Sequence, residues 1–198
     1  MDATNPLTDP LHLAVITGST REGRFGPTVA RWFSAEAEWH PSFTVTEIDL
    51  AEVDLPTTLP RHRTDAQRRY LGELDRADAI VVVTPEYNHG YPASLKQAID
   101  LAKAEWRRKP IGIVSYGARS GGIRATEQLR QVFPELEAMT IRESVALPNV
   151  WHLFDEAGRP RESDGLGTAA RAMLDELAWW AGALRAARRA DELVAMSS

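Results

Sequence analysis

Short apolar runs alternate with amphipathic segments along this chain, and that alternation limits its fold more than any other feature. The clearest run is Ala79 to Thr84, which is apolar at nearly every position. Runs without an in–out alternation of polar residues are typical of strands buried on both faces of a parallel sheet. Further strands are expected at residues 11–17, 43–50, 111–116 and 139–147.

Helical periodicity separates these strands. Apolar residues recur at i, i+3, i+4 and i+7 in Leu95, Ala98, Ile99 and Ala102, the pattern of a helix with one buried face. Comparable patterns predict helices from about residue 27, over 65–76, around 125–133 and over 168–189. Five such β-α units imply a parallel sheet with right-handed crossovers and helices on both faces. We therefore expect one α/β domain over residues 11–190, with flexible tails at 1–10 and 191–198.

Composition narrows the chemistry. Cysteine is absent, which excludes disulfides, thiolate nucleophiles and Cys-ligated metals, and the five histidines are not spaced as metal ligands. The net charge of −5 argues against bulk affinity for nucleic acid. No apolar stretch approaches the roughly 18 residues that span a membrane, and the N-terminus has no signal-peptide pattern. We expect a cytoplasmic protein whose redox chemistry, if any, needs an external cofactor.

Doubly wound sheets bind ligands beyond the carboxyl ends of their strands, so the loops after the first, third and fourth strands form the candidate site. The first of these, residues 17–26, lacks both G-x-G-x-x-G and the Walker A pattern. Its hydroxyls, its arginines and its backbone N–H groups at a helix N-terminus suit a phosphate monoester. A solvated loop is the alternative. The expected cofactor-binding residues here are Ser19, Thr20, Arg21, Arg24, Phe25 and Gly26.

The other two loops carry aromatic residues and glycines. Tyr87, Gly90 and Tyr91 of the second loop could flank a flat heteroaromatic ring, although tyrosines packed at the rim would look the same. The glycines of the third loop let the backbone approach a ligand closely, as would those of a generic flexible loop. The expected cofactor-binding residues of these loops are Pro85, Glu86, Tyr87, Asn88, His89, Gly90, Ser115, Tyr116, Gly117, Gly121 and Gly122.

Three motifs in these loops resemble one known family. They are Gly18-Ser19-Thr20-Arg21, the run Pro85 to Lys96 and Tyr116-Gly117 with Gly121-Gly122. In this combination the chain resembles the NADPH-dependent FMN reductase family, which includes flavin, quinone, chromate and azo-compound reductases. The likeness covers roughly residues 11 to 147, and its most specific element is Pro-Glu-Tyr-Asn before an Ala-Ser-Leu-Lys helix start.

The resemblance implies a flavodoxin-like three-layer α/β/α sandwich, a five-stranded parallel sheet in the order 2-1-3-4-5, and non-covalently bound FMN. Ser19 and Arg21 would hold the FMN phosphate. Residues 85–88 and Gly90 would line the isoalloxazine, and residues 115–117 would close its other side. Many members continue the first loop with Ser-x-Asn where this chain has Arg24-Phe25-Gly26, so Arg24 either contacts the phosphate or faces solvent.

The implied activity is that of an NAD(P)H-dependent oxidoreductase with ping-pong kinetics. NADPH or NADH would reduce the flavin, and a small acceptor such as a quinone, a flavin or an azo compound would then be reduced; no proton-transferring residue and no metal is assigned. The alternatives are an electron carrier like flavodoxin and a non-catalytic flavin-binding sensor. A hydrolase or phosphatase is disfavoured because the chain has neither a cysteine nucleophile nor a G-x-S-x-G elbow.

Two further features have open interpretations. Arg61-His62-Arg63 could meet the 2′-phosphate of NADPH or a partner subunit's site, or could be solvated surface. The resemblance also implies a homodimer or homotetramer. Numerous tryptophans fit a subunit interface, or equally the inside of one subunit; these are Trp106, Trp151, Trp179 and Trp180.

Overall fold

Five parallel strands form one sheet in the order β2-β1-β3-β4-β5 in the computed structural model, which describes residues 9–56, 58, 61–161 and 163–196. The strands are β1 (Leu11–Thr17), β2 (Phe43–Asp49), β3 (Ala79–Pro85), β4 (Pro110–Gly117) and β5 (Met139–Pro148). They alternate with helices α1 (Gly26–Glu38), α2 (Asp65–Arg76), α3 (Ala93–Leu101), α4 (Ile123–Glu135) and α5 (Ser163–Met196). The expected flavodoxin-like sandwich and its strand order are confirmed.

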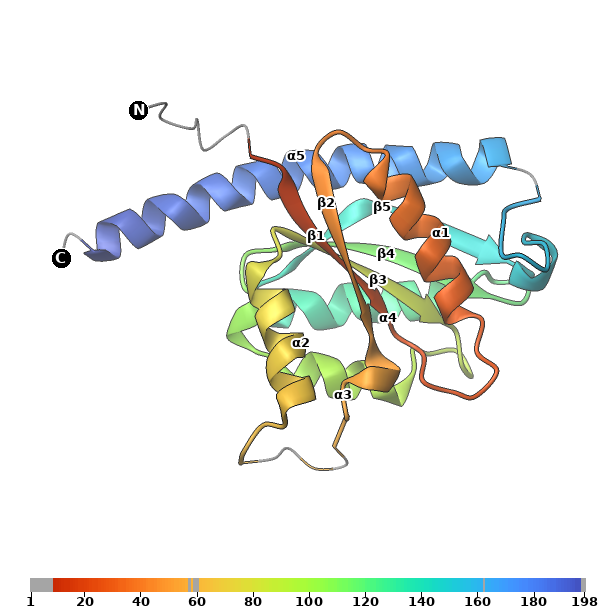
Figure 1. Ribbon diagram of the computed structural model, residues 1–198, viewed down its shortest axis with the longest axis horizontal. Coiled ribbons are helices and arrows are strands. Elements are labelled where there is room, and N and C mark those ends of the chain that lie inside the picture. The colour runs from red at the N-terminus through yellow and green to blue at the C-terminus, as the bar shows by residue number, and fades with distance from the viewer. Residues whose placement is uncertain (1–8, 57, 59–60, 162, 197–198) are drawn as a thin grey trace.

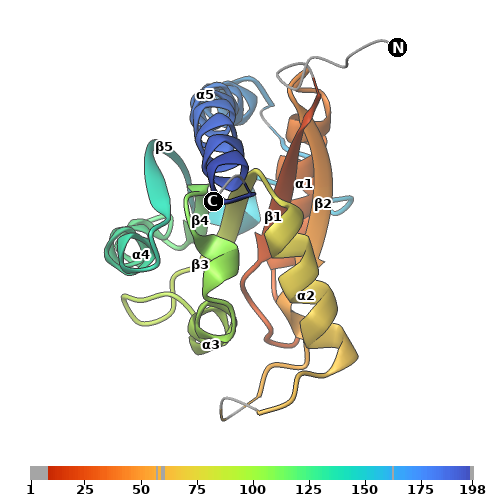
Figure 2. The ribbon, with the colours of Figure 1, turned by 90° about the vertical axis from the view of Figure 1, so that its left-hand side faces the viewer.

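Alternate residues of the central strands belong to two different apolar clusters. Leu13 and Val15 of β1 are buried in one cluster with residues of α1 and α5. Ala14 and Ile16 are buried in the other, with residues of α2, α3 and α4. The helices accordingly cover opposite faces of the sheet (Figures 1 and 2). Because both faces are covered, the strands need apolar residues at every position, which is the pattern seen in the sequence.

The carboxyl ends of the parallel strands meet at one edge of the sheet, and the loops there are bonded to one another. The Gly18 N–H donates to the Val83 carbonyl at 2.8 Å, and the Glu86 N–H donates to the Tyr116 carbonyl at 3.0 Å. The segment after β5 joins them, because the Asn149 N–H donates to the carbonyl of Ala118 at 2.8 Å. Four segments distant in sequence are thereby held side by side.

Helix α5 is longer than its sequence pattern indicates. It continues to Met196, so helix replaces most of the tail expected at residues 191–198. Arg185 and Arg188 reach the Asp78 carboxylate, just before β3, at 3.3 and 2.9 Å. These ion pairs hold the second half of the helix on the sheet, and its last turns extend past the sheet edge (Figure 1).

The tail expected at residues 1–10 lies outside the described residues except for Asp9 and Pro10. The carbonyls of both accept hydrogen bonds from Arg185, at 3.0 and 3.3 Å. The approach to β1 is therefore tied to α5.

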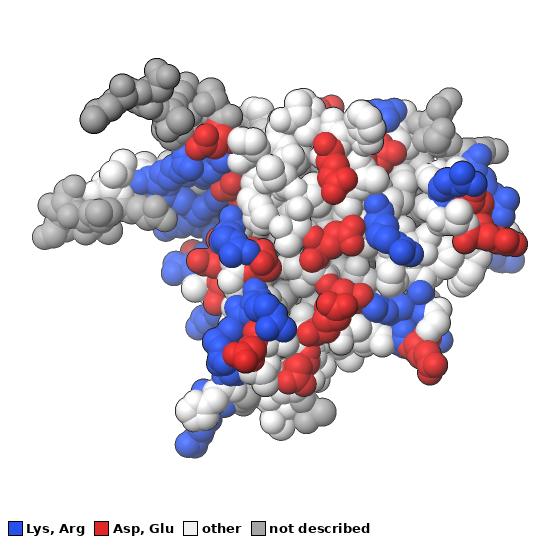
Figure 3. Space-filling model, in the orientation of Figure 1, with Lys and Arg blue, Asp and Glu red and all other residues white. Residues whose placement is uncertain are grey.

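Acidic and basic side chains are interspersed on the face seen in Figure 3, in keeping with the modest net charge of −5. In the described part of the chain, no helix combines the length and apolar character needed to cross a membrane. Within the same residues, no three histidine or carboxylate side chains gather closely enough to hold a metal ion.

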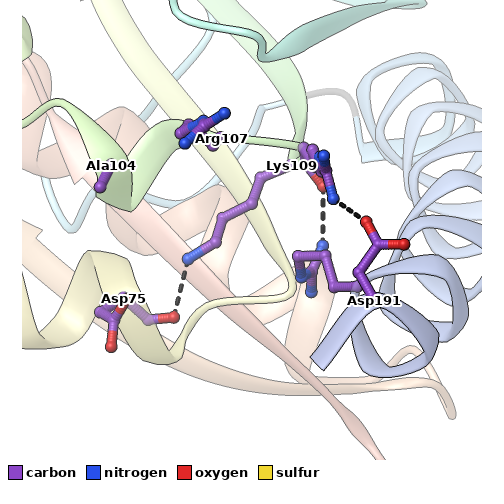
Figure 4. A pocket seen from close by; sticks show the side chains of 7 residues that line it. Asp75, Ala104, Arg107, Lys109 and Asp191 are labelled. Atoms are coloured by element: carbon purple, nitrogen blue, oxygen red, sulfur yellow. Dashed lines mark hydrogen bonds and ion pairs between the residues drawn. The ribbon is translucent and has the colours of Figure 1, made fainter. Parts of the chain in front are cut away.

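Lys109 is almost fully buried at the opposite, amino edge of the sheet, just before β4. Its Nζ donates to the backbone carbonyls of Leu74 and Asp75 in the last turn of α2, reaching that of Asp75 at 2.7 Å (Figure 4). Burial, and to a lesser degree the charge of Arg188, lowers the pKa of Lys109 to about 8. The ammonium group therefore caps α2 at the end where the helix dipole favours a cation, although burial opposes its charge.

We predict that Lys109→Met changes how stability depends on pH. The folded protein holds this proton less tightly than an ordinary lysine, whose pKa is 10.5. Across the interval between these pKa values unfolding takes up a proton, so Lys109 makes the wild type more stable as the pH rises, by on the order of 2 kcal/mol. Urea denaturation at about pH 7.5 and about pH 10 measures the effect. An unchanged pH dependence in the variant would contradict the prediction.

Candidate functional site

A cavity of about 400 Å³ opens at the carboxyl edge of the sheet. Its walls come from the loops after β1, β3 and β4 and from the segment after β5. Small-molecule sites in proteins commonly have volumes of about 300–1,000 Å³. The lining residues are Arg21, Glu22, Gly23, Arg24, Phe25, Pro85, Glu86, Tyr87, Tyr116, Gly117, Ala118, Val150 and Trp151.

A buried pair of hydroxyl groups links the loop after β1 to β4. The Tyr116 hydroxyl donates to Ser19 Oγ at 3.1 Å, and Ser19 is fully buried. Burial raises the pKa of Tyr116 to about 12, against the opposing effect of the Ser19 hydrogen bond, so the phenol is protonated at neutral pH. Gly26 packs directly against this pair, because a Cβ at that position would lie 2.4 Å from Ser19 Oγ.

Arg24 is held within the first loop by an ion pair. Its two Nη atoms each donate to a carboxylate oxygen of Asp49 at 2.6 Å, and Nη1 also donates to the Ser19 carbonyl at 2.5 Å. Burial alone would raise the pKa of Asp49, but the hydrogen bonds from Arg24 and from a backbone N–H bring it below its ordinary value. The Arg24 side chain is 16% exposed, so the expectation that it could face solvent is wrong.

The second loop forms a two-residue hairpin. Tyr87 and Gly90 exchange backbone hydrogen bonds of 2.8 and 3.0 Å, and the two residues between them, Asn88 and His89, have φ angles of +51° and +70°. Positive φ at both central residues is the pattern of a type I′ turn. Gln128 of α4 donates to the His89 carbonyl at 3.0 Å, so the helix holds the tip of the turn.

Glu86 connects the second loop to the third. Its carboxylate accepts hydrogen bonds from Ser120 Oγ at 3.0 Å, from the Arg124 N–H at 3.1 Å and from Arg124 Nη1 at 2.7 Å. Burial would raise the pKa of Glu86, but these bonds outweigh it and lower the pKa below its ordinary value. Glu86 is therefore ionised at neutral pH and accepts hydrogen bonds at both carboxylate oxygens.

Two glycines give the third loop a backbone conformation that packs closely on β4. Gly121 and Gly122 have φ angles of +60° and +88°, which side chains rarely tolerate. A Cβ on Gly122 would lie 2.6 Å from the Cβ of Ser115, whose hydroxyl donates to the Gly121 carbonyl at 2.8 Å. These three residues brace the cavity wall.

The cavity offers features that suit a flat aromatic ligand carrying an anionic group. The Arg21 guanidinium lies 5.2 Å from the centre of the Tyr87 ring, a cation–π distance. Trp151 and Phe25 add further aromatic surface to the lining. Phe25 makes no side-chain cap for α1, and no acidic residue occupies the first turn of that helix. Pro27 has no N–H, and the Thr28 N–H donates to the Phe25 carbonyl at 3.1 Å. The Gly26 N–H is therefore the backbone donor that the start of α1 leaves for an anion.

The predicted cofactor-binding residues divide into three groups. Those that line the cavity are Arg21, Arg24, Phe25, Pro85, Glu86, Tyr87, Tyr116 and Gly117. Those buried behind it are Ser19, Gly26, Ser115, Gly121 and Gly122, and those outside the lining are Thr20, Asn88, His89 and Gly90. For all of them, a contact with a cofactor stays a prediction.

Several lining residues were missed from the sequence. Val150 and Trp151 follow β5, outside the loops after the first, third and fourth strands, where the sequence predicts the site. Including every carboxyl strand end would have found them. Asp49, which binds Arg24 and does not line the cavity, was also not predicted, and its position at the end of β2 is the sequence signal that points to it.

The Arg61-His62-Arg63 cluster does not line the cavity. Arg63 instead donates from Nη2 to the carbonyl of Leu101, at the last residue of α3, at 2.8 Å. Arg61 and His62 are exposed. Arg63 therefore serves the end of a helix, and contact of this cluster with a nucleotide or a partner subunit stays a prediction.

The tryptophans separate into core and surface residues. Trp106 is fully buried and donates from Nε1 to the Ile99 carbonyl at 3.1 Å, so placing it at a subunit interface is wrong. Trp151 and Trp179 are 58% and 66% exposed. Trp180 packs edge-on against Trp179, with 4.8 Å between ring centres. These three leave aromatic surface exposed on the single chain.

Known proteins share both the sequence and the fold. Residues 11–152 match the family described as NADPH-dependent FMN reductase. An NAD(P)H-dependent FMN reductase from Schizosaccharomyces pombe is 35% identical over 147 residues, which are 69% of this chain and 73% of the relative. A quinone reductase from Pseudomonas putida is 31% identical over 179 residues, 85% of this chain and 93% of the relative.

Among solved structures, FerB from Paracoccus denitrificans, a flavoenzyme NAD(P)H:(acceptor) oxidoreductase, has a TM-score of 0.72 to this chain. The match covers 84% of this chain and 97% of FerB, at 20% sequence identity. At that identity the likeness is one of fold.

Gly26→Ala is expected to destabilise the protein by about 2 kcal/mol, because the new methyl group would overlap Ser19 Oγ and the Tyr116 hydroxyl. The matched control is Gly72→Ala in α2, where a Cβ meets nothing within 4 Å. That control should stabilise the protein by about 0.5–1 kcal/mol through helix propensity. Chemical denaturation of both variants measures the contrast, and equal effects would show that the first turn of α1 is not tightly packed on the hydroxyl pair.

Proposed function

Because the chain belongs to the NADPH-dependent FMN reductase family, we propose that it is an NAD(P)H-dependent oxidoreductase that binds FMN in the cavity at the carboxyl edge of the sheet and reduces a small acceptor. The observation that supports this site is the convergence of three motif-bearing loops on one cavity of about 400 Å³. Aromatic rings, arginines and an uncapped helix N-terminus meet there.

The residues around the first loop fit the phosphate end of FMN. The N-terminus of α1 and the Arg21 guanidinium would provide hydrogen-bond donors and positive charge to that group. Arg24 keeps the loop in place through its bonds to Asp49 and to the Ser19 carbonyl. Ser19 Oγ accepts the Tyr116 hydrogen bond and keeps its own proton to donate, but Ser19 is fully buried, so a direct contact would require the surrounding loop to open.

The second and third loops fit the ring end. Pro85, Tyr87 and Gly117 line this part of the cavity, and Trp151 stands at its exposed rim. When bound, FMN supplies the ring that accepts a hydride and later passes its two electrons on. The protein's part is to orient the two reactants and to limit access of water.

Glu86 and Tyr116, two of the ionisable residues of the lining, are not suited to proton transfer at neutral pH. Glu86 is held ionised by Arg124 and Ser120, while burial keeps Tyr116 protonated with a pKa of about 12. This supports a reaction in which the protein contributes position and electrostatics, without an obligate acid or base. Glu86 then acts as the connection between two walls of the cavity.

The proposal also covers the acceptor, the kinetics, the oligomeric state and the location of the protein. The acceptor is a small molecule such as a quinone, a flavin or an azo compound, and the nucleotide and the acceptor use the same face of the cavity in turn, which gives ping-pong kinetics. We also propose a homo-oligomer, supported by the exposed Trp151 and Trp179, and a cytoplasmic location. The competing functions are an electron carrier and a flavin-binding sensor.

The purified protein is expected to be yellow after incubation with FMN and to bleach when NADPH or NADH is added without oxygen. Anaerobic absorbance spectra before and after addition measure this, and initial rates with a quinone then distinguish ping-pong from sequential kinetics. Yellow protein that the nucleotides do not bleach would favour the carrier or the sensor. Protein that binds no FMN would contradict the proposal.

A further inference from the structure

A second cavity, of about 550 Å³, adjoins the one assigned to FMN. It is lined by Glu86, Ala118, Arg119, Ser120 and Arg124. Glu86 and Ala118 line both cavities, so the two spaces meet along the third loop. A molecule seated against the flavin site and too long for it would extend into this second space.

The second cavity carries two cations and one anion. Arg124 is half-exposed, and only one of its Nη atoms is used by Glu86. Arg119 is exposed, and no hydrogen bond or ion pair joins it to any residue that the structure describes. The Glu86 charge is balanced by Arg124, which leaves the charge of Arg119 uncompensated at this position.

We propose that Arg119, together with Arg124, binds the phosphate groups of the nicotinamide nucleotide. The inference rests on the proposed function, because it assumes that the nicotinamide is placed at the FMN cavity. Guanidinium groups bind phosphate oxygens through paired N–H donors, and they keep their charge at every physiological pH. The nucleotide carries at least two phosphate charges, whereas a quinone acceptor carries none and gains nothing from this cavity.

The placement also favours these arginines over the other candidate cations. Arg24 is bound by Asp49, and Arg21 lies over the Tyr87 ring on the side of the first loop. Arg63 is bonded to the end of α3. Arg119 is exposed, as is Arg21, but it differs from all three in having no partner among the described residues. It also lies next to the cavity that holds the reacting end of the nucleotide.

The test is the affinity of the FMN-loaded protein for NADP+ and NAD+, measured by isothermal titration so that no turnover is needed. Arg119→Gln should raise the Kd for NADP+ by about tenfold, the loss of one charge-assisted contact, and Arg119→Glu should raise it further. The wild-type affinity should fall with added salt, and more steeply than that of Arg119→Gln. The control is Arg107→Gln, a half-exposed arginine at the amino edge of the sheet, which should leave the Kd unchanged.

Each outcome decides the proposal. A loss confined to NADP+ supports it and assigns the 2′-phosphate, while an equal loss for both nucleotides supports it and assigns the pyrophosphate. Wild-type affinity in Arg119→Gln, or an equal loss in Arg107→Gln, would overturn it. The FMN affinity of each variant, from quenching of flavin fluorescence, should equal that of the wild type; weaker FMN binding in Arg119→Gln would also overturn it. Failure of the wild type to bind FMN would refute the proposed function instead.

Discussion

The pairing of β3 with β1 on one side and with β4 on the other is the constraint on which the candidate site depends. Both pairings are parallel, with Thr17 opposite Val83 and Pro85 opposite Tyr116. Parallel pairing brings the carboxyl ends of all three strands to one edge, so the motif-bearing loops must leave the sheet together. A shift of this register by one residue would move every side chain of the strand to the opposite apolar cluster and displace its loop relative to the other two.

Side-chain hydrogen bonds and an ion pair then fix the positions of these loops relative to one another. Arg24 joins the first loop to the end of β2, Glu86 joins the second loop to α4, and the Tyr116 hydroxyl joins the first loop to β4. Each bond spans two elements far apart in sequence. Contacts within the protein therefore shape the cavity.

The sequence was sufficient to predict the architecture, because a strand covered on both faces has a recognisable apolar run and a one-sided helix a recognisable stripe. Residues 79–84 and Leu95 to Ala102 are the clearest cases. The motifs were also sufficient to indicate the cavity and most of its lining. The loop conformations depend on glycines and backbone angles within each motif. Such local requirements can be recognised from the sequence.

Other features depended on contacts between distant residues and could not be predicted. The ion pair of Arg24 with Asp49 forms because two strand ends meet in space, and nothing in the local pattern distinguishes it from solvent exposure. The burial of Trp106 follows from its position beneath Phe133. Beyond residue 189, Asp191 of α5 forms an ion pair with Arg108, a contact that has no periodic signal in the sequence.

The positions of Lys109 and of the Asp78 ion pairs have one more consequence. These buried charges lie at the amino edge of the sheet, while the candidate site lies at the carboxyl edge. Changes that improve packing or charge at the amino edge can therefore raise stability without touching a ligand. Natural proteins operate only slightly above the stability they need, and new activities usually lower it. In this fold one edge can accumulate the stability that lets the loops of the other edge diverge toward new acceptors.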